Sequence, residues 1–131
     1  MAESVSEPTD LQLYFFYNRL SHPDMLRHVL SLEKRPTLVP AFIVSYKIQY
    51  WLACPCLIRD EDDPTSKVNG YAWWGPRSYH PLLKEDMIPN FDPHTTTVHI
   101  EGKEVLGHTA IYNGIHEGLF SDPDIAMGRF Y

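Results

Sequence analysis

Short apolar runs separated by polar breaks follow one another along the chain, a pattern that predicts strands more often than helices. The first run, residues 11–17, reads Leu-Gln-Leu-Tyr-Phe-Phe-Tyr and predicts a buried strand. Further runs rich in β-branched and aromatic residues predict one or two strands at 39–51 and single strands at 68–74, 95–100 and 104–112. The last two would pair as a hairpin around Glu101, Gly102 and Lys103. Pro55 would interrupt the chain before the apolar residues 56–58.

One segment has the period of a helix. Ser21 is its expected N-cap, Pro23 suits its first turn, and Pro36 closes it. Its apolar positions at helical spacing are Met25, Leu26, Val29, Leu30 and Leu32. A second, weaker helical turn is expected around residues 82–87.

Five or six closely spaced strands with few helices between them predict an α+β fold, a small mixed or antiparallel β-barrel with one or two helices. Residues 1–10 are polar and acidic and are expected to form a flexible tail. Residues 11–131 are then expected to form a single domain, a length that is sufficient for a hydrophobic core without metal or disulfide crosslinks.

The charge balance narrows the range of partners. The chain has 131 residues, with 11 Lys and Arg against 17 Asp and Glu, a formal net charge of −6. Without a basic cluster, neither a nucleic acid nor an anionic membrane is expected as a partner. The first residues do not read as a secretion signal, and no apolar run is long enough to span a membrane. A cytoplasmic protein with reduced thiols is the expected class, since a disulfide across Cys54-Pro55-Cys56 would be strained.

Candidate metal and cofactor sites are weak in this sequence. The seven histidines lack the tight spacing of metal ligands, and no cofactor motif is present, so we expect neither a metal nor a cofactor. His99 and His108 could face each other across the predicted hairpin. A histidine acting as a proton shuttle is the more plausible role, with His22 and His80 as the first candidates.

The order of several short segments resembles that of a known family. Leu-Tyr-Phe-Phe-Tyr-Asn-Arg-Leu at residues 13–20 resembles the Tyr-Gly-Ser-Leu signature that opens the γ-glutamylcyclotransferase-like (AIG2-like) family. Similar likenesses follow in the family's order at residues 40–47, 52–57, 67–73 and 95–112. The sequence is therefore identified as a divergent member, with the resemblance running over nearly the whole chain.

The resemblance implies where a ligand would bind. In the family, the loop after the first strand holds a γ-glutamyl group through backbone amides at the mouth of the barrel. Here Tyr17, Asn18, Arg19 and Leu20 would form this first-strand loop (residues 17–20), with Asn18 and Arg19 in place of Gly and Ser. Asn tolerates left-handed backbone geometry. Arg19 could bind a substrate carboxylate, or else point to solvent or pair with Asp24.

The resemblance also implies a catalytic acid. The family uses a glutamate as acid and base while the substrate's own amine attacks its γ-carbonyl and releases 5-oxoproline. Here Glu85 and Asp86 lie just short of the expected position, so Glu85 or Asp86 would exchange the proton. The alternatives are that both lie on a surface turn and that the acid is missing.

Cys56 replaces an alanine that borders the family's pocket. Its thiol could be a nucleophile, or simply a small buried side chain. The aromatic content suits a bulkier and less polar ligand than a γ-glutamyl amine, so we expect weak or no 5-oxoproline production from γ-glutamyl amino acids. The sequence thus predicts a cofactor-independent enzyme that cyclises, isomerises or transfers an acyl group within a small molecule, and secondary metabolism is the expected setting. The alternative is a binding or interaction module without catalysis; either is expected to be a monomer or homodimer.

Overall fold

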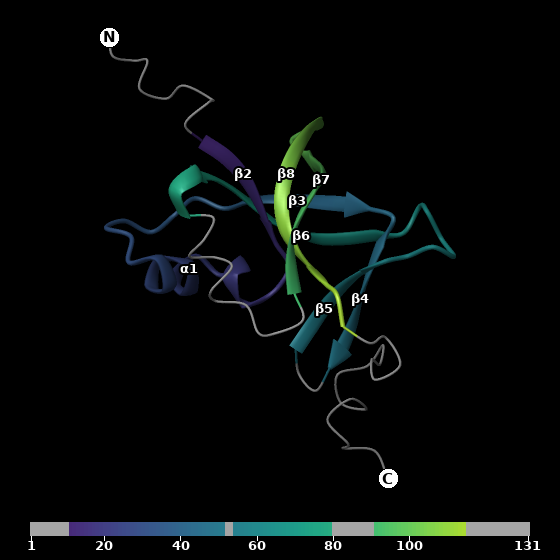
Figure 1. The fold of residues 1–131 in the computed structure, drawn as a ribbon. Coiled ribbons are helices and arrows are strands. Elements are labelled where there is room, and N and C mark those ends of the chain that lie inside the picture. The colour runs from purple at the N-terminus through teal and green to yellow at the C-terminus, as the bar shows by residue number, and fades with distance from the viewer. Residues whose placement is uncertain (1–10, 52–53, 80–90, 115–131) are drawn as a thin grey trace.

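Five strands close into a barrel in the computed structural model, which describes residues 11–51, 54–79 and 91–114. In barrel order the strands are β2 (Leu11–Phe16), β6 (Lys67–Pro76), β3 (Val39–Val44), β7 (Phe91–Ile100) and β8 (Lys103–Tyr112). Neighbouring strands are antiparallel except for β2 and β8, whose parallel pairing closes the barrel (Figure 1). The expected α+β class with a small mixed barrel is therefore confirmed.

The barrel interior is filled by apolar side chains, as the alternation along the strands predicts. Its buried members are Leu13, Phe15, Ala41, Ile43, Tyr46, Leu57, Val68, Ala72, Val98 and Ile100. At Gly70, β2 and β6 approach so closely that a Cβ would overlap the backbone oxygen of Phe16 and lie 2.8 Å from Cζ of Phe15. Glycine is therefore required at this crossing.

The helix α1 (Pro23–Leu30) covers an outer face of the barrel beside β2, and a short 3-10 turn, η2 (Arg19–Ser21), precedes it (Figure 1). A second apolar cluster fills this interface, consisting of Tyr14, Phe16, Leu20, Leu26, Leu30 and Trp73. The predicted N-cap was wrong: it is His22, in extended conformation, and not Ser21. The reason is Pro23, because a proline pushes the residue before it out of helical geometry.

A second sheet of two antiparallel strands, β4 (Tyr46–Trp51) and β5 (Cys54–Arg59), follows β3. The chain turns from β3 into β4 at Ser45, whose φ of 78° is left-handed. Residues 39–51 therefore form two strands. The expected interruption at Pro55 does not occur: Pro55 lies within β5, opposite Tyr50, and a two-stranded sheet has open edges where a missing N–H is tolerated.

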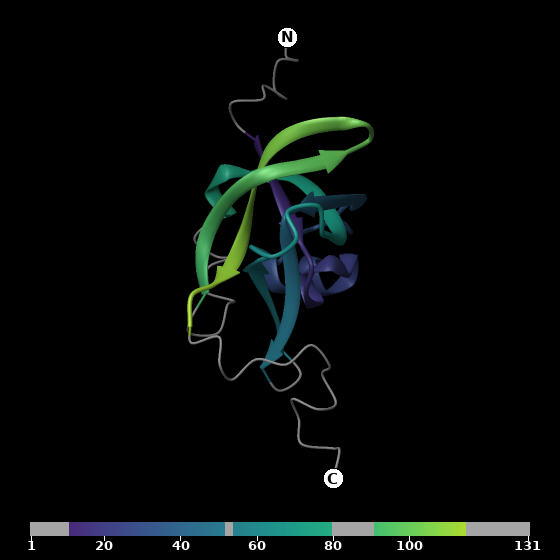
Figure 2. The ribbon, with the colours of Figure 1, turned by 90° about the vertical axis from the view of Figure 1, so that its right-hand side faces the viewer.

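The predicted hairpin is confirmed and is longer than expected. β7 and β8 pair from Phe91 with Tyr112 to Ile100 with Lys103, and they run side by side along the molecule, away from α1 (Figure 2). Glu101 and Gly102 form the turn with φ values of 51° and 77°, the geometry of a type I′ turn.

The expectation that two hairpin histidines face each other is wrong. In the register of β7 and β8, His99 lies opposite Glu104, and His108 lies opposite Thr95. The remaining described element is the 3-10 turn η3 (Arg77–Tyr79), while the weak helix expected at 82–87 and the tail at 1–10 fall outside the described residues. None of the described helices has the length and apolar character needed to cross a membrane.

Candidate functional site

The first-strand loop connects the end of β2 to η2. Its backbone at Asn18 is extended, with φ −110° and ψ −155°, so no left-handed geometry is needed where the family has glycine. The Asn18 side chain instead accepts a hydrogen bond from the backbone N–H of Leu20 at 3.1 Å. This N–H is one of the amides that the resemblance assigns to substrate binding, and in this structure the protein's own side chain occupies it.

Arg19 and Leu20 point in different directions from the loop. Leu20 is only 3% exposed and anchors the turn in the apolar cluster beneath α1. Arg19 is exposed, and its Nη1 lies 3.2 Å from the sulfur of Met25. Asp24, the alternative partner considered for Arg19, pairs with Arg35 at 2.9 Å. Arg19 therefore places a cation at the surface of the loop.

Tyr17 lies where the loop meets the barrel interior. Its hydroxyl donates a hydrogen bond to the backbone oxygen of Ala110 on β8 at 2.8 Å. Burial raises the pKa of Tyr17 far above its usual range, an effect that a backbone hydrogen bond involving Leu57 partly offsets. At neutral pH this hydroxyl is therefore a fixed hydrogen-bond donor and not a base.

Two thiols from β5 lie in the same region as Tyr17, and both contribute to the raised pKa of its hydroxyl. Cys56 is completely buried and packs with Ile58, against Phe91 and Tyr112. Its Sγ lies 3.5 Å from the backbone oxygen of Cys54. Burial raises the pKa of the Cys54 thiol, and a hydrogen bond with Cys56 partly offsets this rise. The packing of Cys56 fits a small buried residue, and its possible role as a nucleophile stays a prediction.

The remaining residues predicted from the sequence are His22 and three that fall outside the described residues. His22 is exposed and caps α1 without a side-chain hydrogen bond. Glu85, Asp86 and His80 lie outside the described residues. The structure thus places Tyr17 near the two thiols and joins Asn18 to Leu20 by a hydrogen bond, while the catalytic carboxylate remains an expectation.

A polar cluster that the sequence did not reveal connects β4 to β7. The hydroxyl of the buried Tyr46 lies 2.7 Å from Nε2 of His94 and 3.1 Å from Oγ1 of Thr96. Burial lowers the pKa of His94, and the nearby Arg59 cation lowers it further. Arg59 also lies over the Tyr46 ring, at 5.0 Å from its centroid. This cluster holds the two-stranded sheet against the barrel with a neutral histidine.

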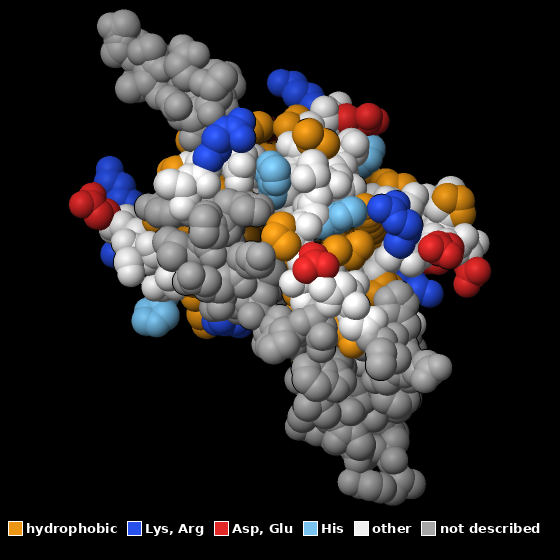
Figure 3. Space-filling model, in the orientation of Figure 1, with side chains coloured by type: hydrophobic (Ala, Val, Ile, Leu, Met, Phe, Trp, Pro, Cys, Tyr) orange, Lys and Arg blue, Asp and Glu red, His pale blue; other side chains and the backbone are white. Residues whose placement is uncertain are grey.

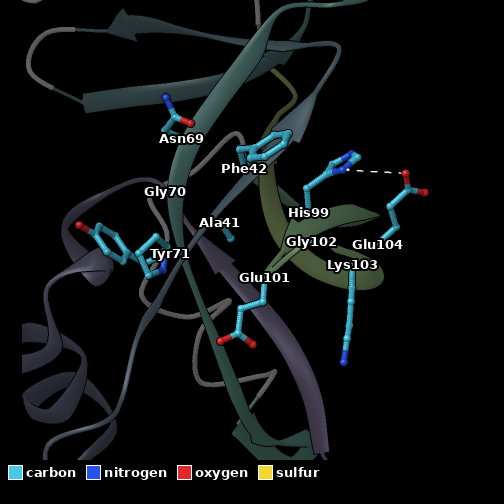
Figure 4. A pocket seen from close by; sticks show the side chains of 11 residues that line it. Ala41, Phe42, Asn69, Gly70, Tyr71, His99, Glu101, Gly102, Lys103 and Glu104 are labelled. Atoms are coloured by element: carbon cyan, nitrogen blue, oxygen red, sulfur yellow. Dashed lines mark ion pairs between the residues drawn. The ribbon is translucent and has the colours of Figure 1, made fainter.

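A second feature missed by the sequence is a groove of about 550 Å³ between β6 and the turn of the β7–β8 hairpin (Figure 4). Phe42 forms part of its wall, stacked on His99 with ring centroids 4.7 Å apart, while the Lys67 ammonium lies 4.4 Å from the Phe42 ring centroid. Nδ1 of His99 is 4.0 Å from a carboxylate oxygen of Glu104. These residues come from the four strands β3, β6, β7 and β8, so only closure of the barrel brings them together.

On the face shown in Figure 3, acidic and basic side chains of the described residues are interspersed. In the turn between β5 and β6, two acidic side chains, Asp60 and Asp63, accept hydrogen bonds from backbone N–H groups of the same turn. Within the described ranges no three His, Cys, Asp or Glu side chains converge as a metal site.

Neither a protein-family model nor a curated protein sequence matches this chain. Solved structures do match it. The solution structure of At3g28950.1 from Arabidopsis thaliana superposes with a TM-score of 0.67 at 18% identity, over 82% of this chain and 66% of that one. A γ-glutamyl cyclotransferase also gives 0.67, at 14% identity over 79% of this chain and 67% of that one.

A third match is a yeast γ-glutamyl cyclotransferase specific to glutathione, with a TM-score of 0.54 at 14% identity, covering 83% of this chain and 75% of that one. This chain thus spans about two thirds to three quarters of the length of these three proteins. The chain has the γ-glutamylcyclotransferase-like fold, which confirms the fold that the sequence resemblance implied. At these identities the likeness concerns the fold, and a fold can carry different activities.

Proposed function

We propose that this protein is a cofactor-independent enzyme that cyclises a small molecule by intramolecular acyl transfer at the first-strand loop. The substrate would be an amide with a free amine and carboxylate at one end and an aromatic or aliphatic leaving group at the other. Tailoring of a secondary metabolite is the setting that suits such a substrate. The structures that match the chain include γ-glutamyl cyclotransferases, which supports this reaction class.

The observation that carries the proposal is the construction of the loop. At the end of β2 the chain presents the Tyr17 hydroxyl inward and the Arg19 cation outward, with the amides of η2 between them. Arg19 offers a charged donor for a carboxylate or a developing oxyanion. The aromatic and apolar residues around Tyr17 suit the less polar part of a ligand.

The reaction balances without a cofactor. The substrate's amine nitrogen attacks its own acyl carbon and loses a proton, the amide C–N bond breaks, and the leaving amine takes up a proton. In the proposal, Glu85 or Asp86 accepts the first proton and delivers the second. Cys56 would border the substrate without forming a bond to it.

The test is turnover by a carboxylate variant. Purified protein is incubated with γ-glutamyl amides of aromatic amines, and the released amine and 5-oxoproline are measured by mass spectrometry. In the Glu85→Gln, Asp86→Asn double variant, turnover should fall by about 100-fold or more, with thermal unfolding measured to show that the variant folds. Unchanged turnover in the folded variant would remove both carboxylates from the mechanism.

One observation favours a second candidate, a small-molecule binder without catalysis. The Asn18 side chain already occupies the N–H of Leu20, which withdraws a donor that the reaction would use. A binder predicts saturable ligand binding without product, and affinity that does not depend on Glu85 or Asp86. The same incubations, combined with calorimetry, distinguish the two functions.

A further inference from the structure

The groove between β6 and the turn of the β7–β8 hairpin lies on the outer face of the barrel. Ala41 on β3 pairs with Gly70 on β6 and with Ile100 on β7, and it belongs to the apolar interior of the barrel. Since side chains alternate along a strand, the residues on either side of this row point outward. Those that line the groove are Pro40 and Phe42 on β3, Asn69 and Tyr71 on β6, and His99 on β7.

The floor of the groove is formed by backbone. Gly70 has no side chain and the methyl group of Ala41 is turned inward, so the space above them stays open. The rings of Phe42 and Tyr71 point away from each other on either side of this floor (Figure 4). The volume of about 550 Å³ falls within the range of about 300–1,000 Å³ that is typical of small-molecule sites.

Charge is distributed unevenly along the groove. At one end, the Lys67 ammonium lies 4.4 Å from the ring centroid of Phe42. The hairpin turn begins one residue beyond the last pair of β3 with β7, on the Tyr71 side, and carries the exposed Glu101. Figure 4 shows the Glu101 side chain on the side of the turn nearer β6 and the Lys103 side chain on the far side. A cation is therefore favoured at the Tyr71 end of the groove and disfavoured at the Phe42 end.

The Tyr71 end offers two kinds of group that attract an organic cation. The Tyr71 ring is 42% exposed and gives a surface for a cation–π contact, whereas the Phe42 ring already stacks on His99. The charged residues that line the groove are two carboxylates and one ammonium, those of Glu101, Glu104 and Lys103. A carboxylate and an aromatic ring can thus contact the same cation.

We propose that this groove binds a small organic ammonium ion that carries an aromatic body. The ammonium lies between the Glu101 carboxylate and the Tyr71 ring, and the aromatic body lies along the floor toward Phe42. A carboxylate beside the ammonium weakens binding, because it would lie against Glu101. The inference does not depend on the proposed enzymatic function, because it rests on β3, β6 and the hairpin turn alone.

The experiment is an NMR titration of the isotope-labelled full chain with phenethylammonium. Neutral phenethyl alcohol and anionic hydrocinnamate, which have the same aromatic ring, serve as matched ligands. Phenethylammonium should cause saturable shifts in the backbone amides of residues 69–71 and 101–104. The two matched ligands should bind at least about 5-fold more weakly, because they lack the cation that contacts the carboxylate and the ring.

Two substitutions test the two contacts separately. Glu101→Gln and Tyr71→Leu should each weaken phenethylammonium binding by about 5-fold, since one removes the charge and the other the aromatic ring. Glu61→Gln, at an exposed position of the turn between β5 and β6, is the control for the loss of one negative charge. Trp74→Leu, which replaces an exposed ring of β6 outside the groove, is the control for the loss of one aromatic ring. Both controls should bind as the wild type does.

Thermal unfolding shows whether each variant folds. Should Glu101→Gln not fold, Glu101→Asn replaces it, because Asn tolerates the left-handed backbone at this position. Should Tyr71→Leu not fold, Tyr71→Val replaces it, because valine is favoured in strands. The proposal is overturned if the wild type shows no saturable shift at these amides, if phenethyl alcohol or hydrocinnamate binds as tightly as phenethylammonium, or if either folded variant retains wild-type affinity.

Discussion

The side chain of Asn18 accepts a hydrogen bond from the backbone N–H of Leu20 at 3.1 Å. This contact both stabilises the first-strand loop and withdraws from it a donor for an anionic ligand. A residue without the side-chain oxygen removes the cap and frees the N–H at the same time. The first change should lower stability and the second should strengthen ligand binding, so the two effects can be measured separately.

Asn18→Ala should lower the free energy of unfolding by about 1 kcal/mol, the usual effect of losing a side-chain cap, whereas Asn18→Gly should lower it by only a few tenths. Both variants should bind 5-oxoproline or a γ-glutamyl amide more tightly than the wild type, because the Leu20 N–H becomes available. Urea denaturation and calorimetry measure the two quantities. Weaker ligand binding by both variants would show that Asn18 itself contacts the ligand.

Tyr17 should make stability fall at alkaline pH. Burial raises the pKa of its hydroxyl above the ordinary value of 10.0, so above about pH 10 the unfolded chain releases a proton that the folded chain retains. Stability contributed by this group is complete below pH 10 and is lost as the pH rises. The free energy of unfolding of the wild type and of Tyr17→Phe can be measured by denaturation between pH 8 and 11. The wild-type value should fall more steeply with rising pH than that of the variant.

The same substitution should also reduce stability at neutral pH. Tyr17→Phe leaves the backbone oxygen of Ala110 without its hydroxyl donor, which should lower the free energy of unfolding by about 1 to 3 kcal/mol. An unchanged unfolding midpoint at pH 7 would mean that water replaces the hydroxyl at no loss.

His94 should make stability fall at mildly acidic pH. Burial and the Arg59 cation lower its pKa below the ordinary value of 6.5, so as the pH falls through 6.5 the unfolded chain binds a proton before the folded chain does. His94→Gln can retain a hydrogen bond to Tyr46 and does not titrate. Between pH 7 and 5 the wild type should therefore lose stability relative to His94→Gln, as measured by urea denaturation. Parallel curves would contradict the lowered pKa.

The sequence predicted the barrel better than the site, for physical reasons. Alternating apolar residues and a turn-forming Glu101-Gly102 pair act locally, so the strands and the hairpin could be predicted. The helix N-terminus was displaced by one residue because Pro23 constrains the residue before it. Pro55 was misjudged because its tolerance depends on which strand edge is open, and this follows from pairing with β4.

The site depends on contacts that are distant in the sequence. Tyr17 meets Ala110, and Tyr46 meets His94, across separations of 93 and 48 residues. The periodicity of apolar residues predicts local structure and not contacts between residues so far apart in the sequence. The groove around Phe42 and His99 was missed for the same reason, because it exists only after β3 and β7 pair in the closed barrel.

Gly70 should be the glycine of β6 least able to accept a side chain. Gly70→Ala places a methyl group against the backbone oxygen of Phe16, and the resulting strain should lower the free energy of unfolding by about 1 to 3 kcal/mol. The neighbouring exposed residue provides the control, since Asn69→Ala should change stability by less than about 0.5 kcal/mol. Thermal and urea denaturation measure both variants. If Gly70→Ala and Asn69→Ala lowered stability by the same amount, the close approach of β2 and β6 would be contradicted.

The central claim is that the first-strand loop binds the ligand. An NMR titration of the isotope-labelled protein with a γ-glutamyl amide of an aromatic amine tests it most directly, because each backbone amide reports separately. The proposed site predicts saturable shifts in the amides of Tyr17, Asn18, Arg19 and Leu20, reached at lower ligand concentration in Asn18→Gly. Shifts confined to the groove at Glu101, Gly102 and Lys103, or no saturable shift at all, would contradict it.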